Sequence, residues 1–125
     1  MGHVYVRAKF IGKRGERVFD RVMVDTGATY SVLPPEVAEE IGVVTVTEGE
    51  EMEVADGRVI SVRVVGAEVE IEGRRGSTLF AVIGGSQPLI GVLTLERLGF
   101  RVDPVEGRLE PTRPTGRLLA YGGWW

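Results

Sequence analysis

The stretch Val22-Met23-Val24-Asp25-Thr26-Gly27-Ala28-Thr29-Tyr30-Ser31-Val32-Leu33 decides the fold of this chain. Its first three residues form a continuous apolar run, which is typical of a β-strand covered on both faces. Asp25 follows directly, where the apolar run gives no reason for a carboxylate. A carboxylate in such a place costs free energy unless it is hydrogen-bonded, paired or sharing a proton. The position of Asp25 therefore indicates that its carboxylate has a chemical role.

Asp25-Thr26-Gly27 alone could be an ordinary turn, because Asp and Gly are common turn residues. The context narrows that interpretation: an apolar strand precedes the triplet, apolar residues follow it, and a short helix is predicted over residues 34–42. In this context the stretch resembles the active-site segment of the retroviral-type (retropepsin-like) aspartic proteases. Their motif is Asp-Thr-Gly followed by Ala or Ser. The resemblance covers residues 1 to about 110.

Two further segments fit this resemblance. Asp56-Gly57 lies between alternating strands and predicts a β-hairpin with a type I′ turn, which needs positive φ at both central residues. By the resemblance this hairpin would be the flap that closes over the substrate, with Ala55, Asp56 and Gly57 at its tip. Leu89-Ile90-Gly91 precedes a short amphipathic helix expected over 92–99. In the family, such an apolar pair packs beneath the active-site loop.

The rest of the chain is predicted to form short strands joined by turns. Strands are expected at 3–10, 17–21, 43–47, 68–72, 77–83, 100–103 and 108–110, with turns at 12–15 and 73–76 and a loop at 84–88. The predicted fold class is therefore mainly all-β. We expect a closed β-barrel of the retroviral aspartic protease type, with a flap hairpin and one or two short helices. The protease-like domain would span 1–110, and 111–125 would form a C-terminal tail.

Composition excludes several classes of function. The length of 125 residues suggests one domain, and the net charge of -3 argues against a nucleic-acid or anionic-membrane partner. With no Cys and a single His, His3, the chain offers no thiolate chemistry, and we expect neither a metal site nor a cofactor. No apolar run approaches the ~20 residues that span a bilayer, and the N-terminus lacks a signal-peptide pattern. We therefore expect a soluble, cytoplasmic protein.

The resemblance implies a mechanism and an assembly. As is general for aspartic proteases, two carboxylates share one proton across a water, because like charges so close cannot both ionise. The chain has one Asp-Thr-Gly, so the resemblance implies a homodimer in which each subunit contributes its catalytic Asp25. Thr26 would hydrogen-bond across the interface. The substrate would be an extended peptide or unfolded protein, cut beside hydrophobic residues. The residues expected to bind it are Gly27, Ala28, Thr29, Tyr30, Val32, Ala55, Asp56, Gly57 and Ile83.

Three features set this chain apart within the resemblance. A Ser at position 28 could donate a hydrogen bond to the catalytic carboxylate and favour its charged form, whereas Ala28 cannot. We therefore expect a less acidic pH optimum than that of pepsin-like enzymes. An Asp and an Arg that brace the retroviral dimer are replaced here by Thr29 and Val92. The terminal sheet of the retroviral dimer is not recognisable in 100–125, so the interface could instead use 100–102 and 108–109.

Two other functional interpretations remain open from the sequence. The same dimeric fold could be a non-catalytic module that binds peptides or proteins, with Asp25 merely structural. An unrelated small β-barrel with a coincidental Asp-Thr-Gly turn is a weaker alternative. The tail adds a further hypothesis, which is self-cleavage near Leu118-Leu119-Ala120-Tyr121.

Overall fold

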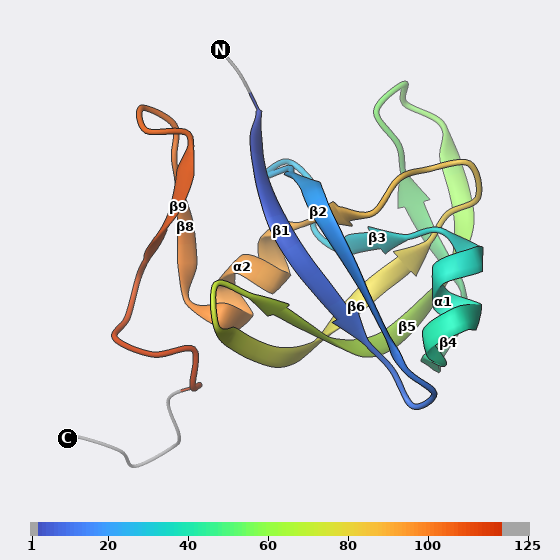
Figure 1. The fold of residues 1–125 in the computed structure, drawn as a ribbon. Helices are drawn as coiled ribbons and strands as arrows, with labels where there is room; N and C mark the ends of the chain where they lie inside the picture. Colours follow the sequence, from blue (N-terminus) through green and yellow to red (C-terminus); the bar gives the residue numbers. More distant parts are fainter. Residues whose placement is uncertain (1–2, 119–125) are drawn as a thin grey trace, which may run out of the picture.

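Seven strands form one sheet, six of which close into a barrel (Figure 1). The structure is a computed structural model that describes residues 3–118. The strands follow the order β1-β2-β7-β3-β6-β5-β4, and β1 also pairs with β5 from Lys9 to Ile11, which closes the barrel. Their bounds are β1 (Val4–Ile11), β2 (Glu16–Val24), β3 (Ser31–Leu33), β4 (Val44–Glu53), β5 (Val59–Ile71), β6 (Arg74–Val82) and β7 (Leu89–Ile90). The predicted mainly-β, closed-barrel fold is confirmed.

The barrel interior is filled by the inward side of alternating strands. In β1, Val4, Val6, Ala8 and Phe10 are buried while the residues between them are exposed or half-buried. Phe10 meets Phe80 of β6 edge-on, with ring centroids 5.7 Å apart. Burying side chains of this size stabilises the fold by roughly 1.5–3 kcal/mol each. This alternation is the reason that residues 3–10 were predictable as a strand.

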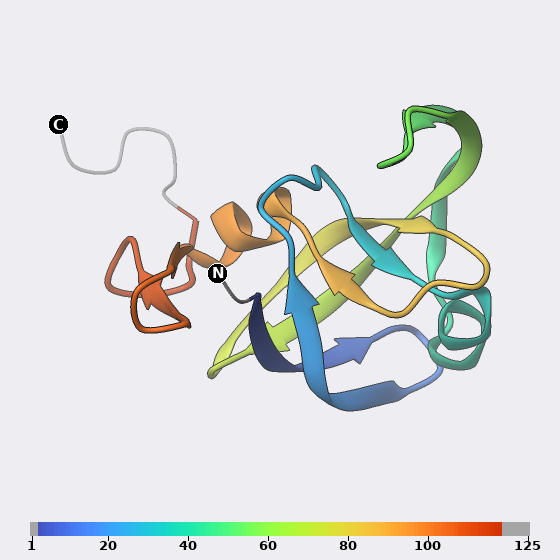
Figure 2. The ribbon, with the colours of Figure 1, turned by 90° about the horizontal axis from the view of Figure 1, so that it is seen from above.

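Two short helices and a separate hairpin complete the described chain. Helix α1 (Pro35–Ile41) ends at Gly42, whose φ of 78° is in the left-handed region. Helix α2 (Val92–Leu98) leads into β8 (Phe100–Asp103) and β9 (Arg108–Pro111), which form a two-stranded sheet beside the barrel (Figure 2). The two short helices confirm the prediction. Among residues 3–118, no helix combines the length and the apolar character needed to cross a bilayer.

The two tight turns next to β5 differ from the sequence-based expectation. At the β4–β5 turn only Gly57 has positive φ, 89°, so the predicted type I′ turn at Asp56-Gly57 is wrong. Its hydrogen bonds, Gly57 N to Val54 O and Val54 N to Arg58 O, instead match a three-residue loop with glycine in the left-handed region. The Asp56 carboxylate accepts the Arg58 N–H at 3.0 Å, and this hydrogen bond stabilises the three-residue loop.

Positive φ at two successive residues occurs instead at Glu72, 50°, and Gly73, 79°. This two-residue turn joins β5 directly to β6, because Ile71 pairs with Arg74. The turn predicted at 73–76 is therefore wrong in its extent, since Arg74 to Gly76 already belong to β6. The glycines predicted a chain reversal here, but the pairing of Ile71 with Arg74 places the turn about two residues earlier than expected.

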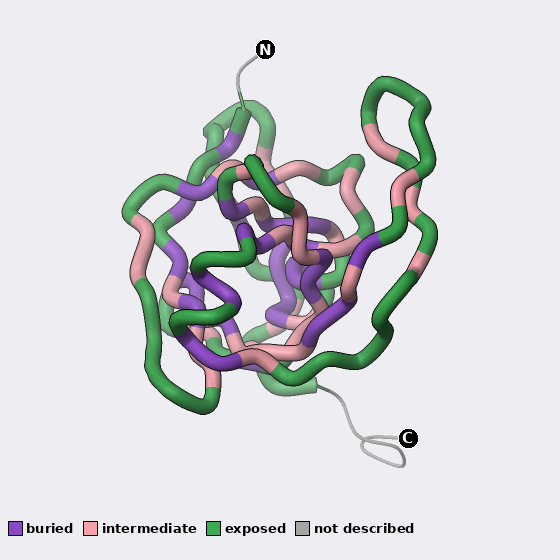
Figure 3. Tube along the Cα trace, turned by 90° about the vertical axis from the view of Figure 1, so that its right-hand side faces the viewer, coloured by how far each residue is buried: buried purple, intermediate pink, exposed green. Residues whose placement is uncertain are grey.

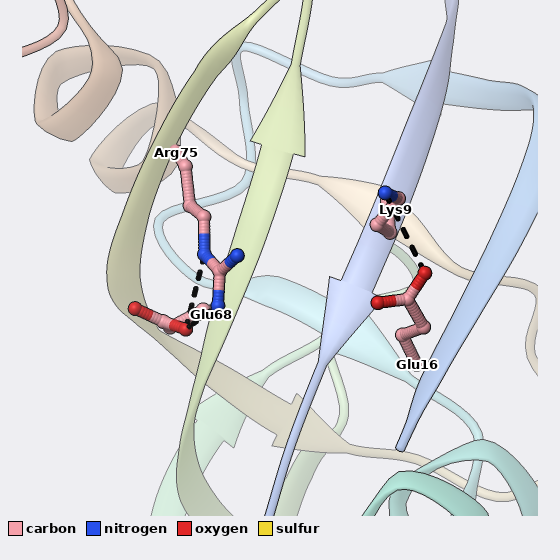
Figure 4. Close-up of polar contacts among 4 residues, drawn as sticks. All are labelled: Lys9, Glu16, Glu68 and Arg75. Carbon is pink, nitrogen blue, oxygen red and sulfur yellow. Dashed lines mark hydrogen bonds and ion pairs between the residues drawn. The ribbon is translucent and has the colours of Figure 1, made fainter.

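Ion pairs lie on the outer surface of the barrel but contribute little to its stability. Lys9 and Glu16 lie 3.5 Å apart on the β1–β2 pair, and Arg75 lies 2.7 Å from Glu68 on the β5–β6 pair (Figure 4). All four side chains are at least one-third exposed. Exposed pairs of this kind contribute about 0–1 kcal/mol each. The apolar interior therefore supplies most of the stabilisation.

Candidate active site

Asp25 occupies the first position after β2, in a loop that is hydrogen-bonded to itself and to β7. Its N–H donates to the Ile90 carbonyl at 2.9 Å, and its own carbonyl accepts the Ala28 N–H at 3.1 Å. The carboxylate oxygen Oδ1 accepts the Gly27 N–H at 2.9 Å. Asp25 is half-buried, so its carboxylate is fixed in place but still reachable. This is the environment that a buried strand followed by Asp-Thr-Gly predicted.

The start of α2 fixes the far side of the same loop. The N–H groups of Val92 and Leu93 donate to the carbonyls of Ala28 and Thr29 at 2.8 and 3.1 Å. The first N–H groups of a helix have no partner within the helix, so they are free for this role. Two segments far apart in sequence are thereby joined backbone to backbone.

Gly91 is the point of closest approach between these segments. A Cβ atom there would lie 2.4 Å from the Tyr30 carbonyl oxygen and 2.8 Å from that of Ala28, so no side chain fits. The residues before it, Leu89 and Ile90, are half-buried and fully buried. The Leu89-Ile90-Gly91 landmark thus lies against the loop, as the resemblance implied.

A buried cluster of hydroxyl groups supports the loop from below. The hydroxyl oxygens of Ser31 and Thr94 lie 2.6 Å apart, and Ser31 Oγ also accepts the Gly91 N–H at 3.0 Å. Thr78 on β6 reaches Thr94 at 3.1 Å. Ser31 and Thr94 are fully buried, so the cluster ties β3, β6 and α2 together beneath Asp25. Sequence reasoning missed these residues, because a single small polar residue in a strand or helix does not show which partners the fold will bring to it.

A family model described as aspartyl protease matches residues 6–96. This chain belongs to the aspartyl protease family. A search of curated proteins gives no match. The matched region holds Asp25-Thr26-Gly27, the β4–β5 hairpin and Gly91, while β8 and β9 lie outside it. The retropepsin-like resemblance is confirmed at the level of the family, which is of peptidase type.

In this aspartyl protease domain, the residues expected to bind substrate are placed in two regions. Thr26, Gly27 and Thr29 are exposed on the active-site loop, and Ala55, Asp56 and Gly57 are exposed at the hairpin tip. Ala28, Tyr30, Val32 and Ile83 are half-buried. Tyr30 and Ile83 pack against a second, smaller apolar cluster of Val62, Val64 and Ala81. Met52 and Ile60 of the hairpin pack against the same cluster, and neither was expected from the sequence.

One cavity of the aspartyl protease domain opens beside the strand that leads into Asp25. It has a volume of about 360 Å³ and is lined mainly by apolar side chains, including Met23 and its β7 partner Leu89. A larger cavity of about 630 Å³ lies between β1 and β9. Neither cavity is lined by a residue of the Asp25 loop, so the candidate site is assigned from Asp25 and its hydrogen bonds instead.

The acidic and imidazole groups of the described residues do not form a metal centre. No cluster of three or more His, Asp or Glu side chains between residues 3 and 118 could hold a metal ion. The carboxylate of Asp25 accepts the backbone N–H of Gly27 in the described part of the chain.

Proposed function

We propose that this chain is an aspartic endopeptidase that is active as a homodimer. The observation that carries the proposal is the placement of one carboxylate, Asp25, in a loop fixed to both β7 and the start of α2. Membership of the aspartyl protease family supports the same chemistry. Each chain supplies a single Asp-Thr-Gly, so two copies are needed to bring two such carboxylates together.

In this proposal the two Asp25 carboxylates hold one water between them and share one proton. The charged carboxylate accepts a proton from the water, which then attacks the carbonyl carbon of the scissile peptide bond. The protonated carboxyl group donates a hydrogen bond to the carbonyl oxygen as the tetrahedral centre forms. Thr26 would hydrogen-bond across the interface, and the Gly27 carbonyl would accept a hydrogen bond from the peptide backbone.

The proposed substrate is an extended peptide or an unfolded protein with hydrophobic residues beside the cut. Support comes from the half-buried apolar surface around Tyr30 and Ile83. The β4–β5 hairpin would act as the flap. A cytoplasmic site of action remains a prediction from the sequence.

The test is cleavage of an unfolded protein such as casein between about pH 3 and 7, with and without pepstatin. Asp25→Asn removes the ionisable group and keeps the shape, so we expect at least a 10³-fold loss of activity, comparable with losses of essential catalytic groups. Asp20→Asn is the matched control, because the Asp20 side chain is 91% exposed and forms an ion pair with the surface residue Arg7. It should cleave like the wild type.

Activity that is equal in wild type and Asp25→Asn would show that the cleavage does not depend on Asp25, and would overturn the proposal. Inactivity of the wild type as a folded dimer would also overturn it. That second outcome would favour the non-catalytic binding module.

A further inference from the structure

A hydrogen bond joins the β4–β5 hairpin to the active-site loop. The Tyr30 hydroxyl, at the end of that loop, donates to Glu50 Oε2 on β4 at 2.9 Å. Both residues are half-buried. A hydrogen bond to a charged acceptor is stronger than one between neutral groups. The contact therefore links the part of the site that holds Asp25 to the hairpin that would cover it.

The local structure of β4 directs Glu50 toward this contact. The pairing of β4 with β5 is irregular between Thr45 and Thr47 and again between Thr47 and Glu50. Such bulges re-aim the side chains that follow them. From Glu50 onward, Glu50 and Met52 are half-buried while Glu51 and Glu53 are exposed. The second irregularity thus precedes the point at which β4 begins to turn alternate side chains inward.

Apart from this hydrogen bond, the hairpin is fixed by Met52 and Ile60, which pack against the same apolar cluster as Tyr30. It projects from the barrel and is mostly exposed along its length (Figure 3), and Val46 and Val59 are 58% and 61% exposed. Segments with few buried contacts open at low free-energy cost. The charge-assisted hydrogen bond is therefore a polar contact that acts beside this apolar packing to hold the hairpin near Tyr30.

We propose that Tyr30 and Glu50 are a positioning pair that sets the placement of the β4–β5 hairpin over the active site and so controls substrate binding. Its effect on catalysis rests on the proposed peptidase function, whereas its effect on the hairpin does not. The negative charge of Glu50 also disfavours ionisation of the phenol. The hydrogen bond and the adjacent carboxylate, together with burial, raise the pKa of Tyr30 above its usual value of 10.0.

The first experiment measures amide hydrogen exchange of residues 48–60 in wild type and Tyr30→Phe. We expect exchange to be roughly tenfold faster in the variant, the factor that corresponds to about 1.4 kcal/mol. Tyr5→Phe is the matched control, because Tyr5 lies on β1 outside the hairpin and the Asp25 loop. Exchange in Tyr30→Phe equal to that in Tyr5→Phe would overturn the proposal.

The second experiment titrates the phenol of Tyr30 by ultraviolet absorbance, using the difference between each protein and its Tyr30→Phe form. Glu50→Gln keeps an acceptor but removes the charge, so the pKa of Tyr30 should fall toward its usual value. Glu51→Gln, on the exposed side of the same strand, should leave it unchanged. An unchanged titration in Glu50→Gln would count against the pair.

Steady-state kinetics then test the functional consequence. Tyr30→Phe and Glu50→Ala should raise KM several-fold and leave kcat within about twofold. Glu50→Gln keeps a hydrogen-bond acceptor, so it should raise KM less than Glu50→Ala does. Exchange and titration effects without any protease activity would preserve the hairpin role and refute the proposed function. A fall in kcat alone with unchanged KM would contradict control of substrate binding.

Discussion

Gly91 lies where the two segments of the candidate site touch, so it offers a sharp test of the geometry. Gly91→Ala would force a Cβ atom to within 2.4 Å of a backbone oxygen that has no free space to move into. Overpacking of this kind costs about 1–3 kcal/mol, and we expect the upper part of that range. Urea denaturation measures the change. Gly84→Ala is the control, because nothing lies within 4 Å of its added atom, and equal stability of the two variants would contradict the close contact.

Ala28 is the residue at which we expect the pH dependence to be set. Ala28→Ser adds a hydroxyl beside the carboxylate of Asp25, which would favour the charged form and move the pH optimum of cleavage to lower pH. The pH profile of kcat/KM measures this shift, with Ala55→Ser at the exposed hairpin tip as the control. A wild-type optimum already below about pH 3, well under the usual carboxyl pKa of ~3.9, would contradict the argument.

Among single residues, the sequence predicted the carboxylate of the candidate site but not the hydrogen-bonded residues around its loop. Asp25 was identifiable because a carboxylate directly after an apolar run is energetically unexpected. Ser31 and Thr94 were not, because each looks like an ordinary small polar residue until the fold brings them within 2.6 Å. Tyr30 was expected to bind substrate, but its hydrogen bond to Glu50 was not predictable, since no local pattern relates residues twenty positions apart.

Among the elements, the β4–β5 turn has a pH dependence that can be derived from its contacts. The backbone N–H of Arg58 and then its guanidinium lower the pKa of Asp56. A carboxyl group whose pKa is lowered on folding stabilises the fold above its unfolded pKa and loses that contribution as the pH falls through the folded value. We therefore expect the Arg58 amide signal in NMR to titrate below the usual Asp pKa of ~3.9. Asp56→Asn should abolish that titration, and a midpoint at or above ~3.9 would contradict the contact.

Most elements were predictable, but the short strands β3 and β7 were not expected, and β5 is one continuous strand where the sequence suggested two segments. Alternation of apolar residues located β1 and β5, and proline and glycine bounded α1. The turn residues gave the correct reversals but assigned the type I′ geometry to Asp56-Gly57 instead of Glu72-Gly73. The side chain of Asp56 decided the first case and the pairing of Ile71 with Arg74 the second. Both depend on partners that a local pattern does not contain.

The segment after β9 makes a contact that its composition did not predict. Arg113 donates to the carbonyls of Glu96 and Arg97 at 3.0 and 2.7 Å, at the C-terminal end of α2. Arginine there complements the partial negative charge of a helix C-terminus. The self-cleavage hypothesis concerns Leu118-Leu119-Ala120-Tyr121, of which 119–121 lie outside the described residues, so it stays a prediction.

For the whole molecule, the proposed dimer predicts a specific dependence on protein concentration. If the site needs an Asp25 from each of two copies, specific activity should fall on dilution below the dimer dissociation constant. Activity measured across a thousand-fold dilution, alongside sedimentation of the same samples, tests this expectation. A covalently linked tandem dimer is the control and should keep its activity. Constant specific activity in samples that sediment as monomers would refute the dimer.

The barrel class was predictable, whereas its closure and its outer parts were not. Strand-rich patterning with the Asp-Thr-Gly motif implied a family and therefore a barrel. The pairing of Lys9 with Glu70 that completes it leaves no trace in either segment alone. The β8–β9 sheet was expected as two short strands, but its position beside β1 follows only from tertiary packing.

That closing contact also governs how the chain would fold as it is synthesised. The β1–β2 hairpin is local and can form within microseconds once residues 4–24 have left the ribosome. The other edge of β1 can pair only after the far part of β5 has been made, so during that interval β1 is paired with β2 alone and has one open edge. The chain loses the entropy of closing this long loop before the contacts between β1 and β5 form, and this slows folding. The same pairing that shapes the barrel therefore makes the nascent chain dependent on a late, long-range step.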